Sequence, residues 1–131
     1  MPLTEHQIER YERQLLLPEV GGRGQQALLR ATVRIYGTGK AADEVATYLV
    51  AGGVGAVLLD ASFPEASRQR LEALNPDVRI HFEGASDFEV ECGDSNDRFE
   101  GATKALSIMM ACIGMERSEN WTNQTEAWWT V

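Results

Sequence analysis

The stretch from residue 37 to residue 42 carries the residue types that hold a phosphate at the start of a helix. Gly37, Gly39 and Ala42 match the pattern G-x-G-x-x-A. In that pattern the first glycine permits a tight turn, the second lets the backbone approach a phosphate, and the third small residue allows close helix–strand packing. Asp60 follows about 20 residues later, where a carboxylate can accept hydrogen bonds from a ribose. The candidate nucleotide-binding residues are therefore Gly37, Thr38, Gly39, Lys40 and Asp60.

The same residues leave three interpretations open. ATP is one candidate ligand, and NAD is another, because the fingerprint is shared with nicotinamide-binding domains. Alternatively, the small residues serve only the packing of strand and helix around an empty pocket. The ammonium of Lys40 either pairs with a phosphate or occupies the space that a phosphate needs.

The flanking sequence supplies the elements that such a turn requires. Residues 32–36 and the apolar run 55–60 are typical of buried parallel strands, and a helical pattern that ends at Gly52 and Gly53 lies between them. Further elements are expected at 64–74 (helix), 77–82 (strand) and 87–92 (a more exposed strand). Upstream, Thr4 and Gln7 fit a capping box. We expect a turn at Gly21, Gly22 and Gly24 and a short helix at 25–30.

The order of these elements predicts an α/β fold, a Rossmann-like doubly wound and mostly parallel sheet with an N-terminal helical extension. One domain is expected over residues 1–114, with the extension in residues 1–31, and a polar tail over residues 115–131. A last helix closes the domain, with an expected buried side of Phe99, Ala102, Leu106, Met109 and Met110. Trp121, Trp128 and Trp129 in the tail are expected to pack against this domain or a partner.

Composition argues against several partners. The 131 residues carry a net charge of −8, so nucleic acid and anionic membranes, which need a positive surface, are not expected partners. Cys92 and Cys112 are in no metal-ligand spacing, and we expect no metal site. The sequence shows no secretory signal and no apolar run of membrane-spanning length. We therefore expect a cytoplasmic protein with reduced cysteines.

Residues 10–60 resemble the ThiF/MoeB/HesA family, the bacterial relatives of ubiquitin-activating enzymes. The resemblance rests on R-Y-x-R-Q at residues 10–14, G-x-x-G-Q-x-x-L around residues 21–28, the glycine turn, A-G-x-V-G-like residues at 51–55 and L-L-D at 58–60. Members adenylate the C-terminal glycine of a ubiquitin-like protein with ATP and Mg²⁺, and they work as dimers. The resemblance implies that Asp60 meets the ATP ribose and that Gly37 and Gly39 line the phosphates. It also implies that Arg13 reaches the ATP phosphates of a partner subunit.

The chain departs from the family pattern where the chemistry takes place. Lys40 and Ala42 replace two glycines of the family turn, Ser62 stands at the position of a second aspartate, and Phe63 stands near the position of an ATP-binding lysine. The arginines that could approach a phosphate in place of the missing family residues are Arg68, Arg70 and Arg79. Acyl-adenylate formation needs several cations and Mg²⁺ placed together on developing negative charge.

The sequence therefore favours a non-catalytic member that acts as a dimerisation or partner subunit in ubiquitin-like-protein activation or sulfur transfer. Its expected partners are a second copy, an active relative or a ubiquitin-like protein. The alternatives are a minimal ATP-dependent adenylyltransferase and an NAD-binding domain.

Overall fold

The chain contains six helices and four strands within residues 3–15 and 20–117, the part of the chain that this computed structural model describes. Among the residues of these helices, the side chains of 13, 15 and 115–117 also lie outside the description. In chain order the elements are α1 Glu5–Arg10, α2 Glu12–Leu15, α3 Gly21–Arg30, β1 Thr32–Gly37, α4 Lys40–Ala51, β2 Ala56–Leu58, α5 Glu65–Leu74, β3 Arg79–His81, β4 Phe88–Gly93 and α6 Arg98–Arg117. None of the described helices is long and apolar enough to cross a membrane.

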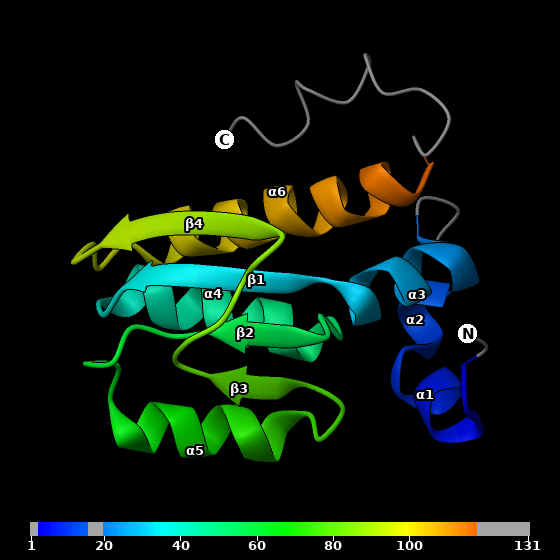
Figure 1. Cartoon of the computed structure of the whole chain (residues 1–131), viewed down its shortest axis with the longest axis horizontal. Coiled ribbons are helices and arrows are strands. Elements are labelled where there is room, and N and C mark those ends of the chain that lie inside the picture. The colour runs from blue at the N-terminus through cyan, green and yellow to red at the C-terminus, as the bar shows by residue number, and fades with distance from the viewer. Residues whose placement is uncertain (1–2, 16–19, 118–131) are drawn as a thin grey trace.

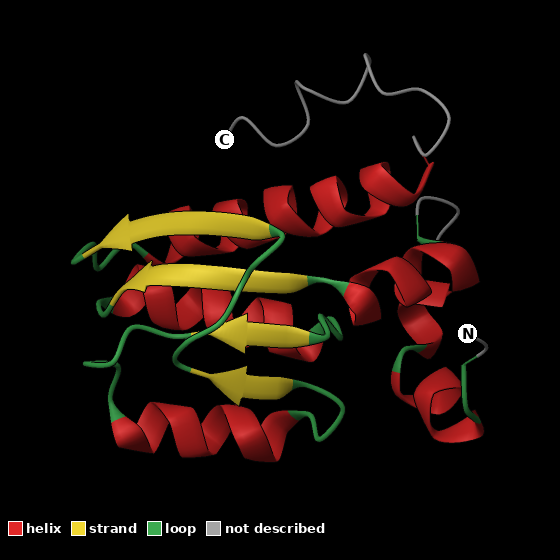
Figure 2. Cartoon of the chain, viewed as in Figure 1, coloured by secondary structure: helices red, strands yellow, loops and turns green. Residues whose placement is uncertain are grey.

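The four strands form one parallel sheet in the order β3-β2-β1-β4 (Figures 1 and 2). Val33 of β1 lies opposite Val57 of β2 on one side and Phe88 of β4 on the other. The chain thus winds from β1 outward to β3 and then returns to the far side of β1. This reversal makes β1 and β4 the switch point of the sheet, and the predicted Rossmann-like α/β class is confirmed.

The two faces of the sheet are covered differently. Helices α4 and α6 lie behind β1 and β4 in Figure 1, whereas the β3–β4 connection crosses in front and contains no helix. Side chains of β4 accordingly alternate between buried and exposed, as expected for its sequence pattern. On the exposed side, the Tyr36 hydroxyl donates to Glu89 at 3.2 Å, and Arg34 donates to the Gly84 carbonyl at 3.1 Å.

The N-terminal helices differ from the prediction in two places. The capping box at Thr4 and Gln7 is present, but α1 ends at Arg10 and α2 begins at Glu12, so Tyr11 interrupts the helical run. The glycines at 21–24 lie inside α3 and do not form a separate turn. Gly24 is buried, but a Cβ there would lie 3.4 Å from Val20 and 3.5 Å from Ile113, which are ordinary contact distances, so packing does not require glycine at this position.

The buried side predicted for the last helix was wrong at Phe99, Leu106 and Met110, whereas Met109 packs partly buried against the core. Phe99, Leu106 and Met110 are 79%, 59% and 45% exposed, whereas the side chains of Ala105, Ile108 and Ala111 are buried. Small residues decide which face packs, because a Cβ on Gly101 would lie 2.4 Å from the Ala41 carbonyl oxygen. Helix α6 can approach α4 this closely only along its glycine and alanine side. Periodicity failed here because α6 is apolar on both faces.

A buried hydrogen-bond network holds the N-terminal helices against the end of α4. Asn75 donates to the Val50 carbonyl at 2.8 Å and to the Tyr11 hydroxyl at 2.9 Å, and Tyr11 donates to Asp77 at 2.9 Å. The fully buried Gln25 donates to the Gly52 carbonyl at 2.9 Å. Carbonyls in the last turn of a helix lack helical partners, so these side chains complete the end of α4.

The same network explains most of the family-like sequence signature. Arg10 pairs with Asp77 at 2.6 Å, and Gln14 donates to both Gln25 and the Gly52 carbonyl. Gly53 has a φ of +86°, and a Cβ there would lie 2.6 Å from the Tyr11 ring. Arg10, Tyr11 and Gln14 of R-Y-x-R-Q therefore meet Gln25 and the glycine pair in one structural contact.

Replacing Tyr11 with phenylalanine tests this network. Burial raises the pKa of Tyr11 to about 12 from its usual 10.0. Its folded-state stabilisation is therefore complete below pH 10 and disappears as the pH rises through 12. We expect Tyr11→Phe to lower the free energy of unfolding by about 1–2 kcal/mol at pH 7. Between pH 10 and pH 12 the variant should lose less stability than the wild type does. Urea unfolding at several pH values measures both effects.

Tyr48→Phe is the matched control, because the Tyr48 side chain is exposed. Burial also raises the pKa of Cys112 to about 12, so the Tyr11 variant retains part of the alkaline loss. Equal stability of wild type and Tyr11→Phe at pH 7 would contradict the network.

Candidate functional site

The candidate nucleotide-binding residues gather at the carboxyl edge of the sheet. Gly37 ends β1, Gly39 is the N-cap residue of α4, and Asp60 follows β2, the neighbouring strand. Gly37 has a φ of +122°, a backbone conformation that requires glycine. The structure brings these residues together at the edge where ligands of open α/β sheets bind, and their role in nucleotide binding stays a prediction.

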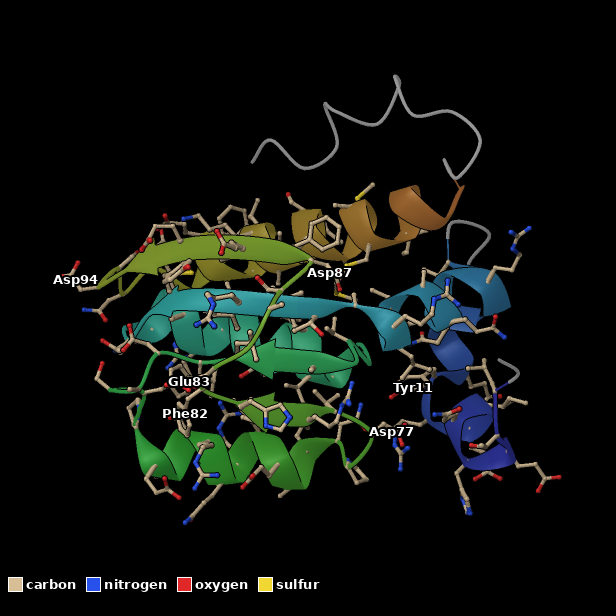
Figure 3. All side chains as sticks on the ribbon, viewed as in Figure 1. Tyr11, Asp77, Phe82, Glu83, Asp87 and Asp94 are labelled. Atoms are coloured by element: carbon tan, nitrogen blue, oxygen red, sulfur yellow. The ribbon has the colours of Figure 1, made fainter. Side chains whose placement is uncertain are left out.

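The backbone donors of this turn are bound to the chain itself. The segment from residue 93 to residue 97, here called the β4–α6 loop, lies against the turn; Figure 3 labels Asp94 at this edge. Thr38 N–H donates to the Gly93 carbonyl at 3.2 Å, and Ala41 N–H donates to the Ser95 carbonyl at 3.0 Å. Lys40 N–H donates to the Asn96 side-chain oxygen at 3.3 Å. Three donors that a phosphate would use are therefore already satisfied.

The two glycines of the turn give space to this loop. A Cβ on Gly37 would lie 2.3 Å from the Gly93 carbonyl oxygen, and a Cβ on Gly39 would lie 2.4 Å from the Ser95 carbonyl oxygen. Both distances are too short for real atoms, and both neighbours are backbone. The backbone of the β4–α6 loop, and not a phosphate, therefore lies against the two glycines in this structure.

The side chains of the turn add little that would hold an anion. Lys40 and Thr38 are exposed, and the Lys40 ammonium has no ion pair or hydrogen bond among the described residues. Asp60 accepts hydrogen bonds from Ser62 N–H at 3.1 Å and from its hydroxyl at 2.8 Å. These bonds lower the pKa of Asp60, so the carboxylate is charged and partly occupied by Ser62.

The positions that depart from the family pattern have structural roles. Phe63, which stands near the expected lysine, is buried in the hydrophobic core. Arg68 pairs with Glu65 and Glu72, and Arg70 pairs with Asp43 at 2.9 Å. Arg79 begins β3 and so lies at the amino edge. In the described chain, none of the three substitute arginines forms a hydrogen bond or ion pair with residues 37–40, although Asp43, the partner of Arg70, lies in the first turn of α4.

The remaining reactive groups do not form a catalytic centre in the described part of the chain. Both cysteines are free and buried, and burial is the main cause that raises the pKa of each thiol. For Cys92, burial raises the thiol pKa more than the nearby Glu100 and Glu91 do. Among the described residues, no group of histidine, cysteine and carboxylate side chains is arranged to hold a metal.

Sequence reasoning missed the loop that contacts the turn. Ser95 and Asn96 follow the carboxyl end of β4, the strand beside β1. A short polar segment directly after a predicted parallel strand was the available signal. Its meaning depended on the strand order, which places β4 next to β1 and which the sequence alone does not give.

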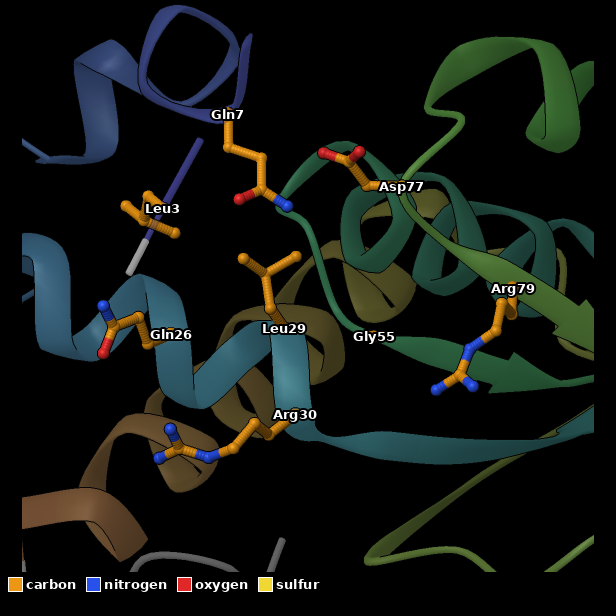
Figure 4. Close-up of a pocket in the computed structure, with 8 residues that line it drawn as sticks. All are labelled: Leu3, Gln7, Gln26, Leu29, Arg30, Gly55, Asp77 and Arg79. Carbon is orange, nitrogen blue, oxygen red and sulfur yellow. The ribbon is translucent and has the colours of Figure 1, made fainter. Parts of the chain in front are cut away.

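A cavity lies at the opposite, amino edge of the sheet (Figure 4). It has a volume of about 340 Å³ and lies between α1, α3 and the first residues of β2 and β3. Its lining residues are Leu3, Gln7, Gln26, Leu29, Arg30, Gly55, Asp77 and Arg79. Asp77 in its wall belongs to the Tyr11 network, so this cavity borders the contact that docks the N-terminal helices.

Two predicted features cannot be placed. The side chain of Arg13 lies outside the described residues, although its helix α2 is described and packs against α3. The tryptophan-containing tail from residue 118 onward also lies outside them.

Comparison with known proteins identifies the relatives of this arrangement. The chain is 37% identical over 102 residues to a sulfur carrier protein adenylyltransferase of Thermus thermophilus, which covers 61% of this chain and 38% of that protein. It is 34% identical over 123 residues to adenylyltransferase and sulfurtransferase MOCS3 of Mus musculus. That match covers 91% of this chain and 24% of the mouse protein. The chain is ThiF/MoeB-like.

Two further findings limit what this likeness shows. The ThiF/MoeB-like chain spans less than two fifths of the length of these relatives, and no family model matches it. Among solved structures, the Escherichia coli tRNA N6-threonylcarbamoyladenosine dehydratase TcdA aligns with a TM-score of 0.59 and 14% identity, over 80% of this chain and 58% of that one. At this identity the match shows a shared fold.

Replacing Gly39 with alanine tests the self-contact of the turn in the ThiF/MoeB-like chain. The φ of Gly39 is −81°, so alanine suits the backbone and the obstruction comes from the carbonyls of Asp94 and Ser95. We expect a loss of about 1–3 kcal/mol in unfolding free energy, measured by urea unfolding without ligand. Thr38→Ala, an exposed neighbour, should stay within about 0.5 kcal/mol of wild type. If Gly39→Ala is equally neutral, the glycine faces open space and the loop does not fill the turn.

Proposed function

We propose that this ThiF/MoeB-like chain does not catalyse adenylation and acts as a dimerisation or partner subunit in ubiquitin-like-protein activation or sulfur transfer. One observation carries the first half of the proposal: the N–H groups of Thr38, Lys40 and Ala41 bind the β4–α6 loop. A nucleotide phosphate would have to displace three hydrogen bonds and a loop backbone. The loss of cations from the surroundings of the turn supports the same conclusion.

The partner role is supported by what the relatives are named for. The Thermus protein is an adenylyltransferase for a sulfur carrier protein, and the mouse protein is an adenylyltransferase and sulfurtransferase. We propose that this chain associates with a second copy of itself, with an active relative or with a ubiquitin-like protein. Its two free cysteines suit the reducing cytoplasm.

We also propose that Arg13 contributes to a nucleotide site in another subunit. Helix α2 lies beside α3 at the amino edge of the sheet, whereas the glycine turn lies at the carboxyl edge (Figure 1). The backbone of α2 therefore lies at the opposite edge of the sheet from the turn of its own chain, so the proposal names a site in another subunit. An active relative that still binds ATP would be the recipient.

Nucleotide titration tests the non-catalytic half of the proposal. We expect no calorimetric signal when ATP with Mg²⁺ or NAD is added to the full chain, because the turn donors are occupied. We also expect no exchange of pyrophosphate into ATP with a ubiquitin-like protein present, while an active relative serves as the positive control. Saturable ATP binding with exchange would establish the minimal adenylyltransferase instead. Saturable NAD binding alone would establish the nicotinamide-binding alternative.

A mixing experiment tests the role of Arg13. The measured quantity is the rate of ATP–pyrophosphate exchange by an active relative. We expect added wild-type chain to change this rate and added Arg13→Ala chain to leave it unchanged. Glu12→Ala, which changes an exposed neighbour on the same short helix, should behave as wild type. Equal responses to wild type and Arg13→Ala would remove Arg13 from the proposal.

A further inference from the structure

The cavity at the amino edge of the sheet has no part in the function proposed above. Its volume of about 340 Å³ falls in the range of small-molecule binding sites. The two ends of the cavity differ in chemistry. In Figure 4, Leu3 and Leu29 lie toward one end, which is apolar, and Asp77 and Arg79 lie at the other, which is polar.

The polar end carries a positive charge that the chain does not balance. Arg79 is exposed, and its guanidinium forms no hydrogen bond or ion pair with another described residue. Among the described residues that line the cavity, Asp77 is the one carboxylate. It pairs with Arg10 at 2.6 Å and accepts from the Tyr11 hydroxyl at 2.9 Å on the same oxygen. Its charge is therefore already compensated, and the guanidinium of Arg79 is left for an anion.

The amide of Gln7 adds a second donor in a fixed orientation. Its oxygen accepts the Thr4 N–H at 3.0 Å in the capping box of α1, and in Figure 4 its nitrogen lies on the side of the polar end. The wall between the two ends is also held by the backbone. Gly55 N–H donates to the Leu28 carbonyl at 2.9 Å, and Arg79 N–H donates to the Gly55 carbonyl at 3.1 Å. A site that is fixed before the ligand arrives loses less entropy on binding.

The apolar end decides which class of anion fits. Leu3 and Leu29 are partly exposed in the wall and offer no hydrogen bond from their side chains. An inorganic anion would leave them in water, whereas an alkyl chain would cover them. A guanidinium presents two parallel N–H donors that match a carboxylate. We propose that this cavity binds a small organic carboxylate, with Arg79 and Gln7 on the carboxylate and Leu3 and Leu29 against the alkyl chain.

A second arginine in the wall is not needed for this arrangement. Arg30 also lines the cavity, but in Figure 4 its guanidinium points away from Arg79. It stands in the last turn of α3, where a cation is favourable because of the helix carbonyls. Arg79 is therefore the cation on which the site depends.

The carboxylate site goes beyond the function proposed above and does not rest on it. The cavity and the glycine turn lie at opposite edges of the sheet. Binding of a carboxylate therefore leaves the question of adenylation open, and ATP turnover at the glycine turn would leave this site in place.

Titration of the full chain with hexanoate, followed through its backbone amide resonances, tests the site. We expect saturable shifts at Leu29, Gly55 and Arg79 and none at residues 37–41. Affinity should rise from acetate through butyrate to hexanoate, by up to about fourfold for each methylene that is buried. Hexylamine, which carries a similar alkyl chain and the opposite charge, should not bind.

Replacing Arg79 tests the residue that carries the proposal. Arg79→Gln should weaken hexanoate binding at least about tenfold, because a hydrogen bond to a charged group is lost. Arg98→Gln is the matched control, since it removes the same charge from an exposed arginine of α6 that pairs with Glu44 at 3.0 Å. This control should bind hexanoate as the wild type does. Circular dichroism shows that each variant is folded.

Four results would overturn the proposal. A wild type that shows no saturable hexanoate binding, or that binds hexylamine equally well, has no carboxylate site. Equal hexanoate affinity of wild type and Arg79→Gln removes the anchoring cation. Shifts at residues 37–41 in place of the cavity would locate the carboxylate elsewhere. Inorganic phosphate that binds as tightly as hexanoate, with the same shifts, would contradict the role of the two leucines.

Discussion

Helix α4 has unpaired N–H groups at one end and unpaired carbonyls at the other, and the chain satisfies both ends from within. At the amino end, the β4–α6 loop supplies the carbonyls of Gly93 and Ser95 and the side chain of Asn96. At the carboxyl end, Asn75 and Gln25 donate to the carbonyls of Val50 and Gly52. Buried helix ends need such partners.

The two ends of α4 involve two different sets of family-like residues, and the two sets have different roles in this chain. The carboxyl end uses the signature residues Tyr11, Gln14 and Gln25, so these residues are explained by stability alone. The amino end uses the glycine turn, whose role in a nucleotide-binding relative would be to face phosphate. A chain can therefore keep a recognisable family sequence while the donors of its phosphate turn serve its own fold.

The sequence was sufficient for the fold because local patterns agreed with one another. The strand–turn–helix at Gly37–Gly39, the buried run before Asp60 and the capping box at Thr4 each predicted the element that forms. Two kinds of information were out of reach. The exposed face of α6 depended on which small residues, such as Gly101, contact α4. The filling of the turn depended on β4 lying beside β1, a long-range fact that no local pattern contains.

Amide hydrogen exchange at the turn tests the central claim most directly. The N–H groups of Thr38, Lys40 and Ala41 can be followed one by one by nuclear magnetic resonance, with and without ATP and Mg²⁺. If the chain's own loop holds these donors, all three exchange slowly in the ligand-free protein, and ATP changes nothing. Rapid exchange in the free protein that becomes slow when ATP is added would show that the turn is an open nucleotide site and that the account is wrong.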